Sequence, residues 1–233
     1  MDKEYSSLLD TYRRMFSIVD AFHFNSQNTA AVFGEYIPIP EDSKVIPITH
    51  GGIIDCRKPK FFDEKVLRLG FIGSEAPYKG LSLLKEVLTR INKDYSEDSL
   101  ILHVYGGRVG VDDSIPNILY KGKFSSDMMG QVFDDMDLLV VPSVWYETFS
   151  FVTLEALSYG TPVLVSDHVG AKDIVLKYNP SFVYHDAECL YQMINKILKD
   201  RTQLKDYHHH LMSDKWDYSL KEHASDIVEK LYV

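Results

Sequence analysis

From Val66 onward, short apolar runs alternate with longer segments in which apolar residues recur every three or four positions. The short runs have the length and composition of buried strands, and the longer segments have the spacing of amphipathic helices. The expected order is strand 66–72, helix 80–91, strand 100–105, strand 118–121, helix 125–135, strand 138–141, helix 151–159, strand 162–166, helix 171–177 and strand 182–184.

Strands that alternate with helices in this way predict an α/β fold with a doubly wound, Rossmann-like parallel sheet. The uninterrupted apolar run LLVV at 138–141 agrees with a strand buried on both faces. In such sheets, ligands bind outside the carboxyl ends of the strands. We therefore look for chemistry in the loops 73–80, 106–110 and 142–150.

The two ends of the chain differ from this middle part. Residues 1–55 predict a helix, a strand at 21–25, a helix at 26–33 and a strand at 44–48, and residues after 186 predict helices.

Composition excludes several classes of protein. The 233 residues include 34 acidic and 25 basic ones, for a net charge of −9, and 45% are hydrophobic. This profile is that of a folded globular chain, and its acidity argues against nucleic-acid binding. Two distant cysteines favour a reducing compartment. Apolar runs of about five residues are too short to span a bilayer, which needs about 20, so we expect a cytoplasmic protein.

The segment 142–166 carries two glutamates. Glu147 lies in the loop after a predicted strand, and Glu155 lies about one turn inside the following helix. The start of that helix, at Phe149–Phe151, presents free N–H groups and a positive dipole end that suit a phosphate. One anion between two hydroxyl-binding carboxylates would fit a nucleotide sugar. The alternative is that both glutamates are solvated surface acids, because this spacing also arises by chance.

Two other loops carry weaker signals. Lys79 stands just before a helix, where it could neutralise a diphosphate, although GFIGSEAPYKG is neither a Walker A nor a GxGxxG motif. Gly106, Gly107 and Arg108 form a turn that a base or phosphate could approach. Each feature alone is equally consistent with an ordinary surface turn.

Taken together, LRLGFIGSEAPYKGLSLL, LHVYGG and the stretch from NILYKGKF to GAKDIV resemble one known family. They are similar to the C-terminal, nucleotide-sugar-binding domain of family 4 retaining glycosyltransferases, which have the GT-B fold. The resemblance is continuous over about residues 45–175. AFHFNSQNTAAVF is similar to the end of the family's N-terminal domain, KVIPITHGGIID to the crossing into the second domain, and WDYSLKEHASDIVEKLYV to the helix that crosses back.

The resemblance implies a role for each matching residue. Glu147 would bind sugar hydroxyls, Glu155 would bind the ribose, and Lys79 would neutralise the leaving diphosphate. The amides of Phe149, Ser150 and Phe151 would hold the sugar and the distal phosphate. The other substrate-binding positions would be Gly73, Ser74, Gly106, Gly107 and Arg108, with Gly122, Lys123 and Phe124 beside the base. No metal and no other cofactor are expected.

Two positions depart from the family pattern. Ser74 replaces an arginine, so either Arg108 supplies the second positive charge or the site binds the diphosphate more weakly. Ser150 replaces a glycine; a serine can still act as an N-cap there, but it narrows the close approach of a ligand to the backbone.

The resemblance also implies a domain organisation. Residues 1–55 would be a remnant of an N-terminal GT-B domain with the crossing, 56–210 the donor-binding domain, and 211–233 the returning helix. The chain would then lack its N-terminal domain and turn over little alone. Apolar residues of the terminal segments would be exposed or buried in a dimer; these are Phe16, Phe22, Phe24 and Leu231.

The implied reaction is hexosyl transfer from a nucleoside-diphosphate sugar to a saccharide or lipid-linked acceptor, in polysaccharide or glycolipid synthesis. The full-length enzyme would be cytoplasmic and peripheral to the membrane. Two alternatives stay open: a non-catalytic GT-B-like interaction module, and another GT-B enzyme such as a nucleotide-sugar epimerase.

Three further sets of residues have simpler interpretations. We expect His208, His209 and His210 at the surface, and Trp145 and Tyr146 packed beside the cleft. His50 lies at the interdomain crossing and is a weaker candidate for ligand contact.

Overall fold

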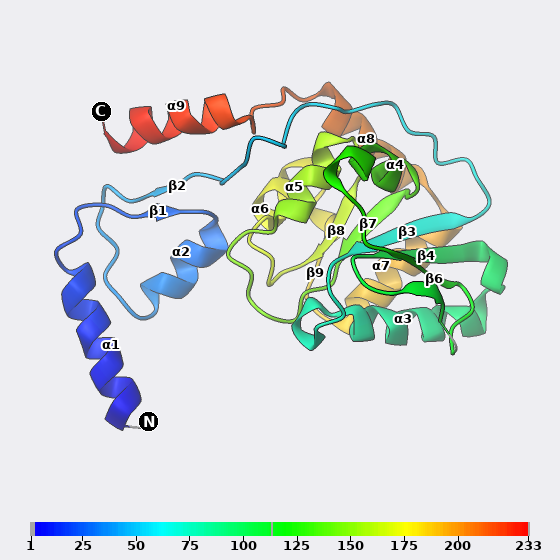
Figure 1. Ribbon diagram of the computed structural model, residues 1–233, viewed down its shortest axis with the longest axis horizontal. Helices are drawn as coiled ribbons and strands as arrows, with labels where there is room; N and C mark the ends of the chain where they lie inside the picture. Colours follow the sequence, from blue (N-terminus) through cyan, green and yellow to red (C-terminus); the bar gives the residue numbers. More distant parts are fainter. Residues whose placement is uncertain (1–2, 113, 233) are drawn as a thin grey trace.

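A seven-stranded sheet in the order β5-β6-β4-β3-β7-β8-β9 forms the centre of the computed structural model, which describes residues 3–112 and 114–232 (Figure 1). All neighbouring strands are parallel except β5, which is antiparallel to β6. The predicted α/β, doubly wound sheet is therefore confirmed. The strands are β3 (Leu67–Ile72), β4 (Leu100–Tyr105), β5 (Val109–Val111), β6 (Ile118–Gly122), β7 (Leu138–Val141), β8 (Val163–Ser166) and β9 (Val183–Tyr184).

Helices cover both faces of this sheet because each carries an apolar stripe. In α3, the buried side chains recur at helical spacing from Leu81 to Ile91. Helices α3 and α7 lie together on one face, and α4, α5 and α8 lie on the other (Figure 1). The helices are α3 (Leu81–Asp94), α4 (Met129–Asp134), α5 (Phe151–Ser158), α6 (Lys172–Tyr178), α7 (Ala187–Lys199) and α8 (Thr202–Ser213), and a 3-10 turn, η1 (Pro77–Lys79), precedes α3.

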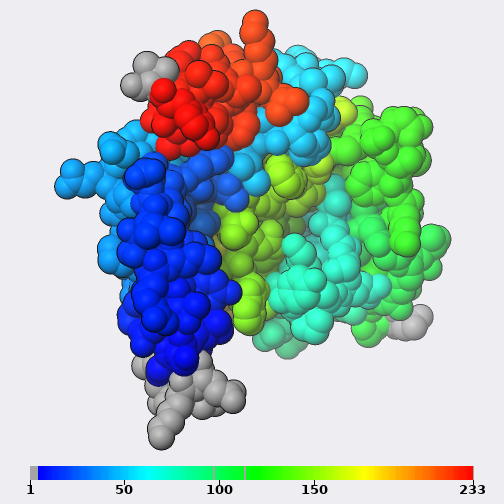
Figure 2. Space-filling view, turned by 60° about the vertical axis from the view of Figure 1, so that its left-hand side comes forward, coloured from blue at the N-terminus to red at the C-terminus, as the bar shows by residue number. Residues whose placement is uncertain are grey.

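Residues 3–45, called here the N-terminal segment, form a separate small layer. It contains α1 (Lys3–Phe16), β1 (His23–Phe24), α2 (Gln27–Gly34) and β2 (Lys44–Val45), with β1 and β2 parallel. The last helix, α9 (Leu220–Leu231), lies over this segment and over the chain that leads to the sheet (Figure 2). The hydroxyl of Thr49 donates to Tyr218 O at 2.7 Å. This hydrogen bond joins the chain between β2 and β3 to the chain that leads into α9.

The expectation of exposed terminal aromatics is partly wrong. Phe24 is buried, and Phe16, Phe22 and Leu231 are half-buried. The ring of Phe22 contacts Phe16 at 5.5 Å and Phe24 at 5.6 Å between centroids. These rings form an apolar layer, which the small β1–β2 sheet needs for its stability. Other large apolar residues of the terminal segments are exposed; on and just after α1 these are Tyr5, Leu8, Tyr12, Met15 and Ile18.

Other local expectations also need correction. Strand β5 was not expected, and the helix predicted at 125–135 is α4 preceded by a 3-10 turn at Ser126–Met128. A serine just before a helix normally predicts a cap, but the hydroxyl of Ser125 donates to the carboxylate of Asp127 and does not cap this turn. His208 is buried rather than at the surface: its Nε2 accepts from Lys60 N at 3.0 Å, and its Nδ1 contacts Gly160 O at 2.8 Å.

No helix in the described part of the chain is both long and apolar enough to cross a bilayer.

The loops after β3 and β7 are pressed together where the order of the sheet reverses. Gly80 has a φ of 75°, and a Cβ at this position would lie 1.7 Å from Pro142 O. Beside this contact, a backbone hydrogen bond joins the same two loops: Val144 N donates to Tyr78 O at 3.0 Å. Only glycine fits at position 80, because a side chain would force the two loops apart.

We predict that Gly80→Ala lowers the free energy of unfolding by about 3 kcal/mol or more, because it combines a positive φ with a backbone clash. Gly51→Ala is the matched control, since a Cβ at position 51 has no atom within 4 Å. Urea denaturation followed by circular dichroism measures both changes. Equal stability of the two variants would contradict the packing described here.

Candidate functional site

Lys79 and Glu147 meet at the carboxyl ends of β3 and β7. Lys79 Nζ lies 2.8 Å from Glu147 Oε1, and the hydroxyl of Ser143 donates to the same oxygen. The two ionic side chains are 33% and 17% exposed. Glu147 is therefore not a solvated surface acid, and two loops that are distant in sequence supply one charged pair at the switch point, where sheets of this kind bind ligands.

Backbone hydrogen bonds hold the Glu147 loop against the loop that follows β8. Glu147 N donates to His168 O at 3.0 Å, Gly170 N donates to Glu147 O at 2.9 Å, and Ala171 N donates to Phe149 O at 2.9 Å. A Cβ at Gly170 would lie 2.3 Å from Thr148 O. The carboxylate of Glu147 is thus presented by a loop that is fixed on both sides.

The N-terminal segment also contacts this loop. The hydroxyls of Ser26 and Thr29 both donate to Thr148 O, at 2.9 and 3.0 Å, and Gln27 N donates to Asp173 Oδ2 at 2.7 Å. The sequence analysis did not single out Ser26, Thr29 or Ser143. The sequence signal that could have indicated such a role is a serine two residues after an apolar strand, as at Ser143, which the structure buries.

Ser150, just before α5, has an unusual backbone conformation. Its φ of 115° is positive, which no other non-glycine residue shows in the described ranges. Its side chain does not cap the helix, contrary to expectation; instead the hydroxyl of Thr153 donates to Ser150 Oγ at 3.1 Å. The backbone N–H groups of residues 149–152 have no acceptor among the described residues. These donors are available to an anion.

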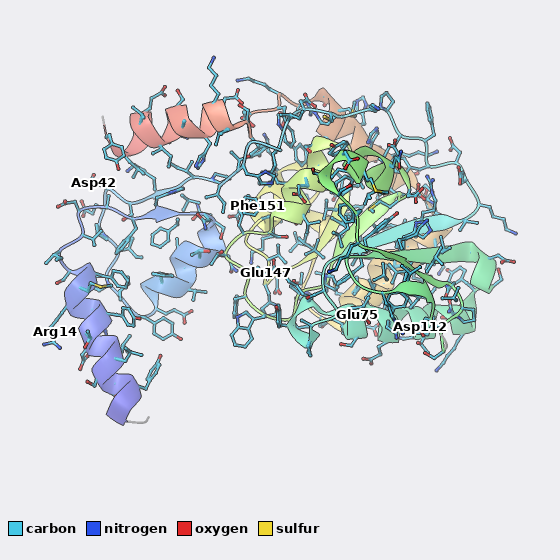
Figure 3. All side chains as sticks on the ribbon, in the orientation of Figure 1. Arg14, Asp42, Glu75, Asp112, Glu147 and Phe151 are labelled. Carbon is cyan, nitrogen blue, oxygen red and sulfur yellow. The ribbon has the colours of Figure 1, made fainter. Side chains whose placement is uncertain are left out.

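Glu155, one turn further along α5, contacts the chain that crosses from the N-terminal segment. Its Oε1 lies 3.3 Å from His50 Nε2, and the side chain of Glu155 is 22% exposed. The His50 ring also packs edge-on against Phe151, with 5.1 Å between centroids. Figure 3 shows Phe151 and Glu147 on the side of the sheet that faces the N-terminal segment. The second glutamate is therefore also a partly buried, hydrogen-bonded group.

The glycine turn after β4 lies against the loop after β3. Gly106 has a φ of 109°, and a Cβ there would lie 2.7 Å from Gly73 O. A Cβ at Gly107 would lie 3.1 Å from Glu75 Oε1. The structure therefore brings Gly73, Gly106 and Gly107 together, as the sequence predicts for loops at one edge of a parallel sheet.

Arg108 is held by acidic neighbours. Its guanidinium lies 3.4 Å from Asp112 Oδ2, 3.8 Å from Glu75 Oε1 and 4.0 Å from the centre of the Tyr120 ring. Burial alone would raise the pKa of Asp112, but hydrogen bonds from Lys85 and Ser114 outweigh burial and hold this pKa well below its usual range. Asp112 thus stays ionised, and part of the positive charge of Arg108 is neutralised.

The remaining predicted positions are spread around the same edge. Gly106 N donates to Gly122 O at 2.8 Å, and Phe124 packs edge-on against Tyr105 at 5.7 Å. Ser74 and Lys123 are exposed. Trp145 is 70% exposed, so the expectation that it packs beside the cleft is wrong. Tyr146 is 58% exposed, but its ring packs edge-on against His168 at 4.8 Å between centroids.

Within residues 3–112 and 114–232, no group of three or more His, Cys, Asp or Glu side chains could hold a metal ion. The prediction that the site works without a metal stays a prediction.

Comparison with known proteins identifies relatives of this fold and sequence. The family model described as glycosyl transferases group 1 matches residues 66–200. An uncharacterised glycosyltransferase of Methanocaldococcus jannaschii is 27% identical over 150 residues, which are 59% of this chain and 37% of that protein. A GDP-mannose-dependent alpha-mannosyltransferase of Mycolicibacterium smegmatis is 29% identical over 110 residues, which are 46% of this chain and 27% of that protein.

Solved structures show the same architecture. Sucrose-phosphate synthase from Thermosynechococcus elongatus has a TM-score of 0.69 at 18% identity, over 97% of this chain and 61% of that chain. Anabaena HepE in complex with UDP-glucose has a TM-score of 0.72 at 16% identity, over 97% of this chain and 67% of that chain. These likenesses show the fold of GT-B glycosyltransferases. The chain spans less than two thirds of the length of its sequence relatives.

Replacing Ser150 tests the strained turn. We predict that Ser150→Gly raises the free energy of unfolding by about 1 kcal/mol, because relief of a strain of about 1–3 kcal/mol exceeds the entropic cost of a glycine. Ser125→Gly is the control, since Ser125 also precedes a helix but has a φ of −99°. Urea midpoints measure both. A loss of stability at position 150 equal to that at 125 would show that the turn is not strained.

Proposed function

The chain belongs to the glycosyl transferases of group 1, and we propose that it forms the donor-binding part of a retaining, family 4 hexosyltransferase. It would bind a nucleoside-diphosphate sugar at the carboxyl ends of β3 and β7. The observation that carries this proposal is the pairing of Lys79 with Glu147 beside the free N–H groups at the start of α5.

The diphosphate would bind where positive charge and free donors converge. Lys79 provides a positive charge that is partly balanced by Glu147 at 2.8 Å. The start of α5 adds N–H donors and the positive end of the helix dipole, worth about 0.3–1 kcal/mol per charge. Donors fixed in advance stabilise the charge that develops on a departing diphosphate without having to reorganise. Ser74 carries no charge, and Arg108 is held by Asp112 and Glu75. Of the two alternatives given by the sequence, these contacts favour a site that binds the diphosphate more weakly over one in which Arg108 supplies a second positive charge.

The two glutamates would bind the hydroxyl groups on either side of that anion. Glu147 would accept hydrogen bonds from the sugar, and Glu155 would accept them from the ribose. The base would lie near Gly122, Lys123 and Phe124, at the carboxyl end of β6. The acceptor, saccharide or lipid-linked, would bind to parts outside the donor site, and the resemblance to the family supports a metal-free transfer.

Titration calorimetry with UDP, GDP and ADP tests the proposal. We predict that the chain binds at least one of them, with a dissociation constant between micromolar and millimolar, because only one cation and one helix end face the diphosphate. The corresponding nucleoside monophosphate should bind about tenfold more weakly. Absence of heat with all three at millimolar concentration would refute a donor site.

Substitution of the charged residues separates their roles. We expect Glu155→Ala to weaken binding of the nucleoside diphosphate about tenfold, because hydrogen bonds to a charged group contribute about 1.5–3 kcal/mol. Glu147→Ala should leave that affinity within about threefold but abolish preference among donor sugars. Lys79→Ala should weaken binding of the nucleoside diphosphate more than binding of the nucleoside monophosphate.

Glu86→Ala, on the exposed face of α3, is the control for these substitutions. Calorimetry on the four variants measures the differences. An affinity equal to that of Glu86→Ala in Glu155→Ala and Lys79→Ala, or an unchanged preference among donor sugars in Glu147→Ala, would remove the corresponding assignment.

A further inference from the structure

We propose that His50 is a positioning residue that holds the carboxylate of Glu155 in the orientation that accepts the ribose hydroxyls. This inference rests on the proposed donor site and adds to it a residue from outside the predicted donor-binding domain. His50 belongs to residues 46–66, which connect the N-terminal segment to the sheet and are called here the crossing segment.

The hydrogen bonds of the His50 ring determine where its proton lies. Gly52 N donates to His50 Nδ1 at 3.1 Å, so Nδ1 acts as an acceptor and carries no proton. In the neutral ring the proton is then on Nε2, which lies 3.3 Å from Glu155 Oε1. A backbone amide therefore selects the tautomer that donates to the glutamate.

The position of the ring is itself constrained. A Cβ at Gly52 would lie 3.1 Å from ring atoms of His50, so a side chain at this position would crowd the ring. The edge of Phe151 supports the ring from α5, at 5.1 Å between centroids. The backbone is anchored on each side, because Ile53 N donates to His50 O at 3.0 Å, Ile53 is buried, and Thr49 donates to Tyr218 O.

This arrangement leaves one oxygen of Glu155 for a ligand. Oε1 accepts from His50, whereas Oε2 accepts no hydrogen bond from the described residues. A free glutamate side chain loses about 1.5–2 kcal/mol of rotamer entropy when a ligand fixes it. If His50 fixes the side chain beforehand, ligand binding no longer has to lose this entropy, and the affinity for a ligand whose hydroxyl contacts Glu155 is higher.

A structural role for the same contact would act differently. If His50 only fastened the crossing segment to α5, its loss would lower stability and weaken all nucleotides equally. A positioning role predicts that loss of the Nε2 donor selectively reduces recognition of the ribose hydroxyls. The informative quantity is therefore the ratio of affinities for a nucleoside diphosphate and its 2′,3′-dideoxy analogue.

Two substitutions separate the donor from the rest of the ring. His50→Gln retains an N–H donor at about the reach of Nε2, whereas His50→Asn keeps an acceptor for Gly52 N but is too short to reach Glu155. The probe is the nucleoside diphosphate that the unmodified chain binds best among UDP, GDP and ADP. Affinities come from titration calorimetry, and the fold is checked by circular dichroism and urea denaturation.

We expect the unmodified chain and His50→Gln to prefer the ribose form about tenfold over the dideoxy form. His50→Asn should reduce this preference to about twofold, and Glu155→Ala should abolish it. In the double variant, His50→Asn should have no further effect, because its role acts through Glu155.

An unchanged preference in His50→Asn, or an equal loss of affinity for both forms, would overturn the inference. So would a further loss of preference when His50→Asn is added to Glu155→Ala. Absence of binding by the unmodified chain would instead refute the proposed donor site, on which this inference depends.

Discussion

The site depends on the close contact between the loops that follow β3 and β7. These strands are neighbours in the sheet, although β4, β5 and β6 lie between them in sequence. The contact requires Gly80, because any Cβ there would overlap Pro142 O. With the loops this close, Lys79 and Glu147 form an ion pair at 2.8 Å across 68 positions of sequence. Parallel pairing alone places both loops at one edge, and the glycine brings them into hydrogen-bonding distance.

A second constraint acts on the start of α5. The positive φ of Ser150 costs about 1–3 kcal/mol and persists only if the surroundings hold it. Those surroundings are identifiable: Gly170 and Ala171 bind the loop from one side, and Ser26 and Thr29 bind Thr148 from the other. The strained turn leaves the amides of residues 149–152 free. The N-terminal segment would thus support the proposed donor site through the backbone that it holds, without placing a side chain in that site.

Much of the sheet was predictable because its strands are apolar runs bounded by turns. Strands β4 and β7 match the predicted limits, since burial on both faces removes any ambiguity of pattern. Strand β5 was missed because VGV is too short to show a period. His208 was misplaced because its burial depends on Lys60 and Gly160, which are distant in sequence.

The site was predictable in its residue types but not in its pairing. A strand, a lysine and a glutamate at loop positions indicate which groups share an edge, but not that Lys79 would contact Glu147 or that Ser143 would share its oxygen. The conformation of Ser150 was equally hidden, because a serine before a helix normally predicts a cap. Tertiary contacts from three loops override that local preference.

The net charge of −9 affects how an anionic ligand would approach the proposed donor site. An acidic chain repels a diphosphate at a distance, but screening limits that repulsion to about 8–10 Å at physiological salt. Within that distance, the buried Asp112 already engages Arg108 and Lys85. In the proposed donor site, attraction would therefore come mainly from Lys79 and from uncharged N–H groups, and the contacts of the N–H groups are little weakened by salt. Affinity for the proposed donor would then depend on how well these groups are fixed beforehand. The contacts around Gly80, Ser150 and His50 share this property of fixing a group in advance.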